Sequence, residues 1–147
     1  MDIVTSYLGL FSAAFLAATI LPGSSEAVLI ALLLGGRGDP VALLVVATAG
    51  NTAGAILNWG LGRWLLRYAG RRWFPVTREQ LDRAGTWFQR YGAWSLLLSW
   101  VPVIGDPLTV VAGTLRMSFL PFVILVGIGK AARYGIVIAG AEAIRSL

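Results

Sequence analysis

The sequence predicts an all-α integral membrane protein, with about three transmembrane helices plus two re-entrant (broken-helix) hairpins in an inverted repeat. Hydrophobic residues make up 57% of the 147-residue chain and charged residues only 13%, about half of the roughly 25% that soluble domains carry. Residues 3–25 and 40–62 contain no charged side chain. Each run exceeds the roughly 20 residues that cross a bilayer as a helix. We therefore expect a single polytopic membrane domain over residues 1–147.

The first half-repeat is expected over residues 1–62. Residues 3–21 form the first predicted spanning helix. Pro22 and Gly23 end it, because proline and glycine together interrupt helical hydrogen bonding. Residues 24–36 are apolar but too short to span, which is typical of a re-entrant segment.

After a glycine-rich turn at residues 35–40, residues 41–62 form the strongest candidate for a span. Gly50 and Gly54 would let another helix approach closely, either in this chain or in a homodimer. Polar residues recur on one predicted helical face: Thr48, Asn51, Thr52 and Asn58. The two asparagines are expected either to donate hydrogen bonds in a polar cavity or to link helices.

The segment 63–92 is basic and joins the two halves. Between Arg63 and Arg90 it has seven arginines against Glu79 and Asp82. Arginines clustered in a short loop between apolar spans follow the positive-inside rule, so we expect this loop (63–90) to be cytoplasmic. The same pattern argues against a nucleic-acid partner, which would need a basic face on a soluble surface.

A short amphipathic helix is expected within this segment. Thr77 and Gln80 fit a capping box at its start, and Gly92 is a suitable stop. Apolar residues line one side of it: Leu81, Ala84, Trp87, Phe88 and Tyr91. Such a helix most simply lies in the headgroup region of the membrane.

The second half-repeat is expected over residues 93–147. Residues 93–115 are apolar but contain two prolines, two glycines and Asp106. A broken or re-entrant hairpin fits this composition better than a straight helix, because proline frees backbone groups that the protein must satisfy. Residues 119–141 are long enough to span the membrane.

The two broken segments share a pattern that predicts the inverted repeat. Pro22 is followed four residues later by Glu26, and Pro102 is followed four residues later by Asp106. Interrupted apolar segments at matching places of two halves are typical of transporter sites, where helix N-termini can hold an anion. Two independently kinked helices would give the same pattern. The structural hinges would be Pro22, Gly23, Pro102, Gly105 and Pro107.

Ionisable residues fall at the expected depth of the membrane, where their burial is costly: Glu26, Asp106, Arg116, Lys130 and Arg133. They would either pair with one another as a scaffold or line a cavity in which carboxylates carry protons and cations bind an anion. The predicted substrate- and proton-binding residues are Glu26, Asp106, Lys130, Arg133, Asn51 and Asn58.

The chain contains neither cysteine nor histidine. Thiol catalysis, histidine-based triads and Cys/His zinc sites are therefore excluded. The sequence also offers no acidic cluster suited to a metal. We expect no catalytic residues, no cofactor and no metal, and thus no enzyme.

Several short motifs are distributed over nearly the whole chain: Pro22-Gly23-Ser24-Ser25-Glu26, Gly50-Asn51-Thr52-Ala53-Gly54, Gly60-Leu61-Gly62-Arg63, Tyr91-Gly92, Trp100-Val101-Pro102-Val103-Ile104-Gly105-Asp106-Pro107, Ala112-Gly113 and Gly129-Lys130-Ala131-Ala132-Arg133-Tyr134. In these motifs the chain resembles the DedA superfamily (SNARE-associated or VTT-domain membrane proteins), and within it the short YqaA-like branch.

The resemblance implies two re-entrant hairpins that face each other across the membrane, and lipid transport or scrambling as the activity. Bacterial members are associated with polyprenyl-phosphate recycling or with the proton-motive force, and Glu26 matches a functional acidic position. Many members carry arginines where this chain has Ser99 and Gly105. Lys130 and Arg133 would have to supply that positive charge here.

The expected function is therefore movement of a lipid or lipid-linked anion, such as a phospholipid or a polyprenyl phosphate, between leaflets, with protons taking part. Two alternatives stay open: a proton-coupled transporter for a small solute or ion, and a scaffold or assembly factor that transports nothing. The expected partners are membrane lipids and a second copy of the chain. The expected location is the cytoplasmic (inner) membrane, crossed several times.

Overall fold

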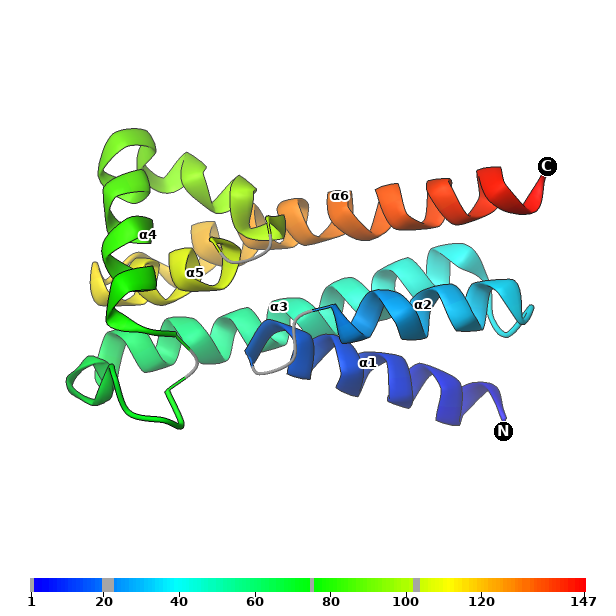
Figure 1. Cartoon of the computed structure of the whole chain (residues 1–147), viewed down its shortest axis with the longest axis horizontal. Coiled ribbons are helices and arrows are strands. Elements are labelled where there is room, and N and C mark those ends of the chain that lie inside the picture. The colour runs from blue at the N-terminus through cyan, green and yellow to red at the C-terminus, as the bar shows by residue number, and fades with distance from the viewer. Residues whose placement is uncertain (1, 20–22, 75, 102–103) are drawn as a thin grey trace. The chain divides into compact units, whose positions relative to one another are not determined.

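The structure, a computed structural model, describes residues 2–19, 23–74, 76–101 and 104–147 (Figure 1). All regular elements in these ranges are helical. No strand occurs in these ranges. The all-α prediction is confirmed. The α-helices are α1 (Ile3–Thr19), α2 (Ser24–Leu34), α3 (Pro40–Trp64), α4 (Arg78–Tyr91), α5 (Gly105–Thr114) and α6 (Phe119–Arg145), with 3₁₀ helices η1 (Leu66–Tyr68) and η2 (Gly92–Trp100).

Among the described residues, two helices are long and apolar enough to cross a membrane. They are α3, with 25 residues, and α6, with 27. The helix α1 has 17 residues and α2 has 11, whereas about 20 are needed to span at 1.5 Å per residue. The third span and the re-entrant character of the hairpins stay predictions.

The contacts divide the chain into two compact units. Unit 1 comprises Met1–Gly54 and Lys130–Leu147, and unit 2 comprises Ala55–Gly129. The two long helices, α3 and α6, each contribute one part to either unit. The predicted half-repeats and the basic loop between them are a different division, and they stay a prediction.

In unit 1, α1 and α2 lie side by side as an antiparallel hairpin (Figure 1). The glycines Gly50 and Gly54 of α3 pack against α1, as the spacing predicts. A Cβ atom added to Gly54 would lie 2.6 Å from the Cβ of Ala18 and 2.7 Å from the carbonyl oxygen of Phe15. This face of α3 thus contacts a helix of the same chain, which is one of the two roles expected for it. A homodimer stays a prediction.

In unit 2, the predicted amphipathic helix is present as α4. The side chain of Thr77 accepts a hydrogen bond from the backbone N–H of Gln80, and the Gln80 side chain caps the backbone of Thr77 in return. This capping box defines the start of α4. Gly92, with φ of 64°, ends it. The helix packs against η2 and α5.

The second broken segment is also present. It forms η2, which ends at Trp100, and α5, which begins at Gly105. Pro107 stands in the first turn of α5, where proline is tolerated because its missing N–H would have no helical partner. A Cβ at Gly105 would collide with the carbonyl oxygen of Ser99. The hinge prolines Pro22 and Pro102 lie outside the described residues.

The helices α3 and α5 approach each other closely within unit 2. A Cβ on Gly62 would collide with the carbonyl oxygen of Val110, and a Cβ on Gly113 would collide with that of Trp59. The indole N–H of Trp59 also donates to the carbonyl oxygen of Met117 at 3.1 Å. The absence of side chains at the two glycines therefore allows the backbones of α3 and α5 to approach each other closely.

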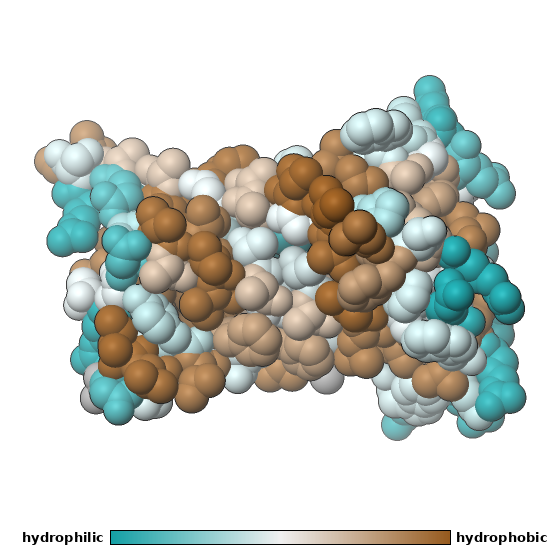
Figure 2. All heavy atoms as spheres, turned by 180° about the vertical axis from the view of Figure 1, so that it is seen from behind, coloured by the Kyte–Doolittle hydropathy of each residue, from teal (hydrophilic) through white to brown (hydrophobic). Residues whose placement is uncertain are grey.

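Large hydrophobic side chains are exposed on the surface. Figure 2 shows broad brown areas on one face of the molecule. The exposed side chains include those of Leu8, Val45, Ile128, Ile136 and Ile144, which are between 55% and 72% exposed. A soluble monomer rarely exposes such large apolar patches, whereas lipid solvates them.

We predict that Gly113→Ala lowers the free energy of unfolding by about 1–3 kcal/mol, because the new methyl group overpacks the α3–α5 contact. The measurement is unfolding in detergent. The matched control is Gly127→Ala on α6, where no atom lies within 4 Å of an added Cβ. That control should be neutral or stabilising by up to about 1 kcal/mol, because alanine is the better helix former. Equal effects of the two substitutions would contradict the packing account.

Candidate functional site

An ion pair joins α2 to α6 in unit 1. The guanidinium of Arg133 contacts the carboxylate of Glu26. The two side chains are 21% and 17% exposed, so the pair is only partly shielded from its surroundings. Glu26 stands in the first turn of α2, where the helix dipole stabilises a negative charge.

Two hydroxyl groups extend this ion pair into the protein. The Ser25 hydroxyl donates to Oε2 of Glu26 at 3.1 Å, and it lies 2.8 Å from the hydroxyl of Tyr134. Serine has one hydroxyl proton. When Ser25 donates it to Glu26, Tyr134 must donate to Ser25. We call Ser25, Glu26, Arg133 and Tyr134 the α2–α6 polar cluster.

Two of the four residues of this cluster are predicted from the sequence. Glu26 and Arg133 are predicted site residues, whereas Ser25 and Tyr134 are not. Both missed side chains are fully buried. A signal for them does exist, because each directly adjoins a predicted residue in the chain. Lys130, one helical turn before Arg133 on α6, is also buried.

Asn51 links helices. Its amide group donates to the carbonyl oxygen of Ala14 on α1 at 2.8 Å, which is one of the two roles expected for it. Its own carbonyl oxygen is buried and accepts no hydrogen bond within the described chain, and the hydroxyls of Thr48 and Thr52 are likewise unpaired there. Buried polar groups are normally satisfied, so this face of α3 retains capacity to bind a polar group or water.

The remaining predicted site residues belong to unit 2. Asn58 is fully buried, and Asp106 is partly buried in the first turn of α5. A single site that contains all six residues stays a prediction. Arg116 lies exposed in the turn between α5 and α6, with φ of 55°, and its position at membrane depth stays a prediction.

An apolar groove runs along the same two helices as the polar cluster. Its volume is about 300 Å³. We call it the α2–α6 groove, and its lining residues are Ile30, Leu34, Ile136, Val137, Gly140, Ala141 and Ile144.

The groove and the ion pair lie on the same helix faces. Ile30 lies one helical turn beyond Glu26 on α2, and Ile136 and Val137 lie one turn beyond Arg133 on α6. The ion pair therefore lies one helical turn from the end of the α2–α6 groove. A charged pair followed by an apolar groove is an arrangement that suits an amphiphile, which has a polar head followed by an apolar chain.

Comparison with known proteins agrees with the sequence motifs. Residues 21–141 match the VTT domain family. The chain belongs to the VTT-domain family, the DedA superfamily. The YqaA-like resemblance is confirmed as well, because this VTT-domain protein is 43% identical over 134 residues to the inner membrane protein YqaA of Escherichia coli K12, which covers 91% of this chain and 89% of that protein.

Two further relatives of this VTT-domain protein are more distant. An uncharacterized protein of Haemophilus influenzae is 39% identical and is covered over 80% of its length by 85% of this chain. A Staphylococcus aureus protein named undecaprenyl phosphate transporter A is 27% identical, over 67% of this chain and 53% of that protein. No solved structure matches.

The VTT-domain protein is thus a membrane protein. The relatives that have descriptive names are named as a membrane protein or a transporter, and not as enzymes. Within the described residues, no group of three or more His, Cys, Asp or Glu side chains could hold a metal ion.

We predict that Tyr134→Phe lowers the free energy of unfolding by about 1 kcal/mol, because Ser25 loses its buried hydrogen-bond partner. Combined with Ser25→Ala, the two losses should be less than additive, since both remove one hydrogen bond. Unfolding in detergent measures this. Tyr7→Phe on α1 is the matched control, since no hydrogen bond of the Tyr7 hydroxyl occurs among the described residues. Additive effects would show that the two hydroxyls are not coupled.

Proposed function

We propose that this VTT-domain protein moves a lipid or lipid-linked anion, a phospholipid or a polyprenyl phosphate, between membrane leaflets with the participation of protons. It would cross the cytoplasmic (inner) membrane several times, with the basic segment 63–90 on the cytoplasmic side. The observation that carries the proposal is the α2–α6 groove with the Glu26–Arg133 ion pair one helical turn from its end.

The groove suits a lipid tail better than a polar solute. Its lining is aliphatic, and three of its residues are at least half exposed: Leu34, Ile136 and Ile144. It therefore opens sideways, to the phase that solvates the exposed apolar surface. A transporter of small polar solutes needs an enclosed aqueous cavity instead, and the groove offers no such environment.

The ion pair supplies the polar end. A phosphate group would compete with Glu26 for the guanidinium of Arg133, because arginine binds phosphate and carboxylate with the same fork geometry. Protonation of Glu26 would weaken its hold on Arg133 and favour the incoming phosphate. The hydrogen bonds from Tyr134 through Ser25 to Glu26 would provide that proton with a path inside the protein.

The chain itself explains why its positive charge would lie on α6. Many family members have arginines at the positions of Ser99 and Gly105. Here an added Cβ at Gly105 would collide with the Ser99 backbone, and Ser99 is buried with no hydrogen bond for its hydroxyl within the described chain. This packing excludes a side chain at Gly105, and Ser99 is enclosed by the protein. Lys130 and Arg133 are the cations of unit 1 at the expected depth of the membrane.

The scaffold alternative accounts for the ion pair but not for the groove. A purely structural pair would be expected to be shielded and flanked by close packing. The similarity to undecaprenyl phosphate transporter A adds support for a lipid-linked anion. Asp106 and Asn58 are proposed as further substrate or proton sites in unit 2, with Asn51 in unit 1.

We predict that the wild-type protein in proteoliposomes exchanges fluorescent phospholipid or polyprenyl phosphate between leaflets faster than empty liposomes do. Glu26→Gln should lower the rate by about tenfold, because the uncharged amide can neither pair with Arg133 nor accept a proton. Asp106→Asn should also lower the rate if both units take part.

A second comparison tests the groove. Gly140→Leu should block exchange, because its side chain fills the α2–α6 groove. Gly135→Leu on the same helix should leave exchange unchanged, since that position also has no atom within 4 Å of an added Cβ and does not line the groove. Folded wild-type protein without exchange, or Gly140→Leu exchanging at the wild-type rate, would contradict the proposal.

A further inference from the structure

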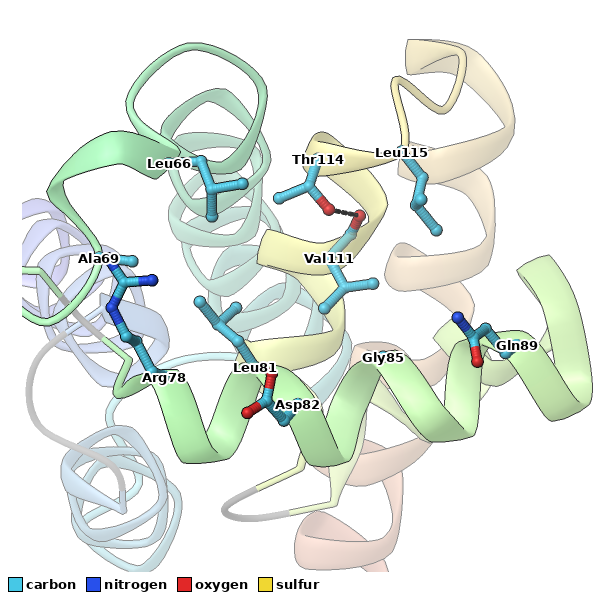
Figure 3. Close-up of a pocket in the computed structure, with 10 residues that line it drawn as sticks. All are labelled: Leu66, Ala69, Arg78, Leu81, Asp82, Gly85, Gln89, Val111, Thr114 and Leu115. Atoms are coloured by element: carbon cyan, nitrogen blue, oxygen red, sulfur yellow. Dashed lines mark hydrogen bonds between the residues drawn. The ribbon is translucent and has the colours of Figure 1, made fainter.

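A second groove lies wholly within unit 2, beneath the amphipathic helix α4. Figure 3 shows it between α4, η1 and the C-terminal part of α5. Its volume is about 360 Å³. We call it the α4 groove, and its lining residues are Leu66, Ala69, Arg78, Leu81, Asp82, Gly85, Gln89, Val111, Thr114 and Leu115.

The inside of the α4 groove is mainly apolar. Leucine and valine side chains from three elements point into it: Leu66 of the η1 segment, Leu81 of α4 and Val111 of α5 (Figure 3). Thr114 contributes little polarity, because its hydroxyl donates to the carbonyl oxygen of Val111 at 2.7 Å. The groove is therefore suited to a hydrocarbon chain.

Gly85 keeps this groove open. It stands in the interior of α4, where glycine costs about 0.5–1 kcal/mol relative to alanine. No close packing requires it, because no atom lies within 4 Å of an added Cβ. This differs from Gly62 and Gly113, where a Cβ would strike backbone. The absence of a side chain at Gly85 therefore leaves space in the α4 groove and is not needed for close packing against another helix.

A cation stands at the rim. Arg78 is exposed at the start of α4, and its side chain extends toward Ala69 (Figure 3). Its guanidinium forms no ion pair or hydrogen bond within the described part of the chain. It belongs to the segment that has seven arginines against two acidic residues. The carboxylate of Asp82 also lines the groove, one helical turn farther along α4, so an anion would find complementary charge at the Arg78 end of the groove.

The surroundings resemble a membrane interface. The indole rings of Trp64, Trp73 and Trp87 and the phenol ring of Tyr91 are exposed in the same unit. Tryptophan and tyrosine gather at the headgroup level of bilayers, and basic amphipathic helices bind there to anionic lipids. An apolar groove with a cationic rim at that level is accessible to a lipid from the surrounding leaflet.

We propose that the α4 groove binds one acyl chain of an anionic phospholipid, whose phosphate is held by Arg78. This site shares no residue with the α2–α6 groove and does not depend on the proposed exchange activity. Its occupant would be a resident lipid of the leaflet that faces α4.

Lipid binding by the purified full-length protein, followed by native mass spectrometry, tests this proposal. Phosphatidylglycerol and phosphatidylcholine with the same acyl chains are titrated separately. The wild type should bind one phosphatidylglycerol about fivefold more tightly than phosphatidylcholine, the factor expected for one arginine near an anionic headgroup. Arg78→Gln should remove this preference. Arg83→Gln, which alters an exposed arginine of the same helix outside the groove, should retain it.

Gly85→Leu tests the chain-binding part. It should lower the affinity for both lipids by about tenfold or more, because leucine fills the groove. The variant should stay folded, since leucine is a better helix former than glycine, and circular dichroism verifies this. Gly9→Leu on α1, another position with open space, should bind like the wild type. Unchanged binding by Gly85→Leu would overturn the proposal. Competition by glycerol phosphate as strong as that of the intact lipid would also overturn it, in favour of a simple anion site.

Discussion

A charged side chain inside a bilayer has to be paired by the protein, because hydrocarbon offers no hydrogen bonds. Glu26 and Arg133 of unit 1, which we expect at membrane depth, would meet this demand by their pairing, and Ser25 and Tyr134 extend the pair into the core. The same contacts tie α2, which has only 11 residues, to the long helix α6. The polar cluster thus joins the two helices that line the α2–α6 groove.

Close approach of backbones is the second constraint on the fold. In unit 1 the glycines of α3 admit α1, and in unit 2 Gly62 and Gly113 admit the mutual approach of α3 and α5. Helix association in lipid relies on such packing, because lipid tails are as apolar as the helix surfaces and the hydrophobic effect does not drive the helices together. Gly85 and Gly140 lie outside these contacts and line grooves instead.

Much of the fold follows from local sequence signals. The capping box at Thr77, the turn before α3 and the break between η2 and α5 each arise from a few adjacent residues, and each is present. The contact between Ser25 and Tyr134 joins positions 109 residues apart. Periodicity predicts that a face is polar, but not which helix it meets. For the same reason the sequence left open whether the Gly50–Gly54 face meets a helix of this chain or of a second copy, and the structure places α1 against it.

In the proposed arrangement, a lipid chain lies in the α2–α6 groove with its headgroup at the ion pair. Photo-crosslinking tests it directly, with an anionic phospholipid that has a diazirine at the middle of one acyl chain. Peptide mapping by mass spectrometry should place the adducts on groove residues such as Ile136 and Ile144, and Arg133→Gln should reduce them. Labelling spread evenly to Ile124 and Ile128 of the same helix, which are 52% and 55% exposed and lie outside the groove, would contradict the account.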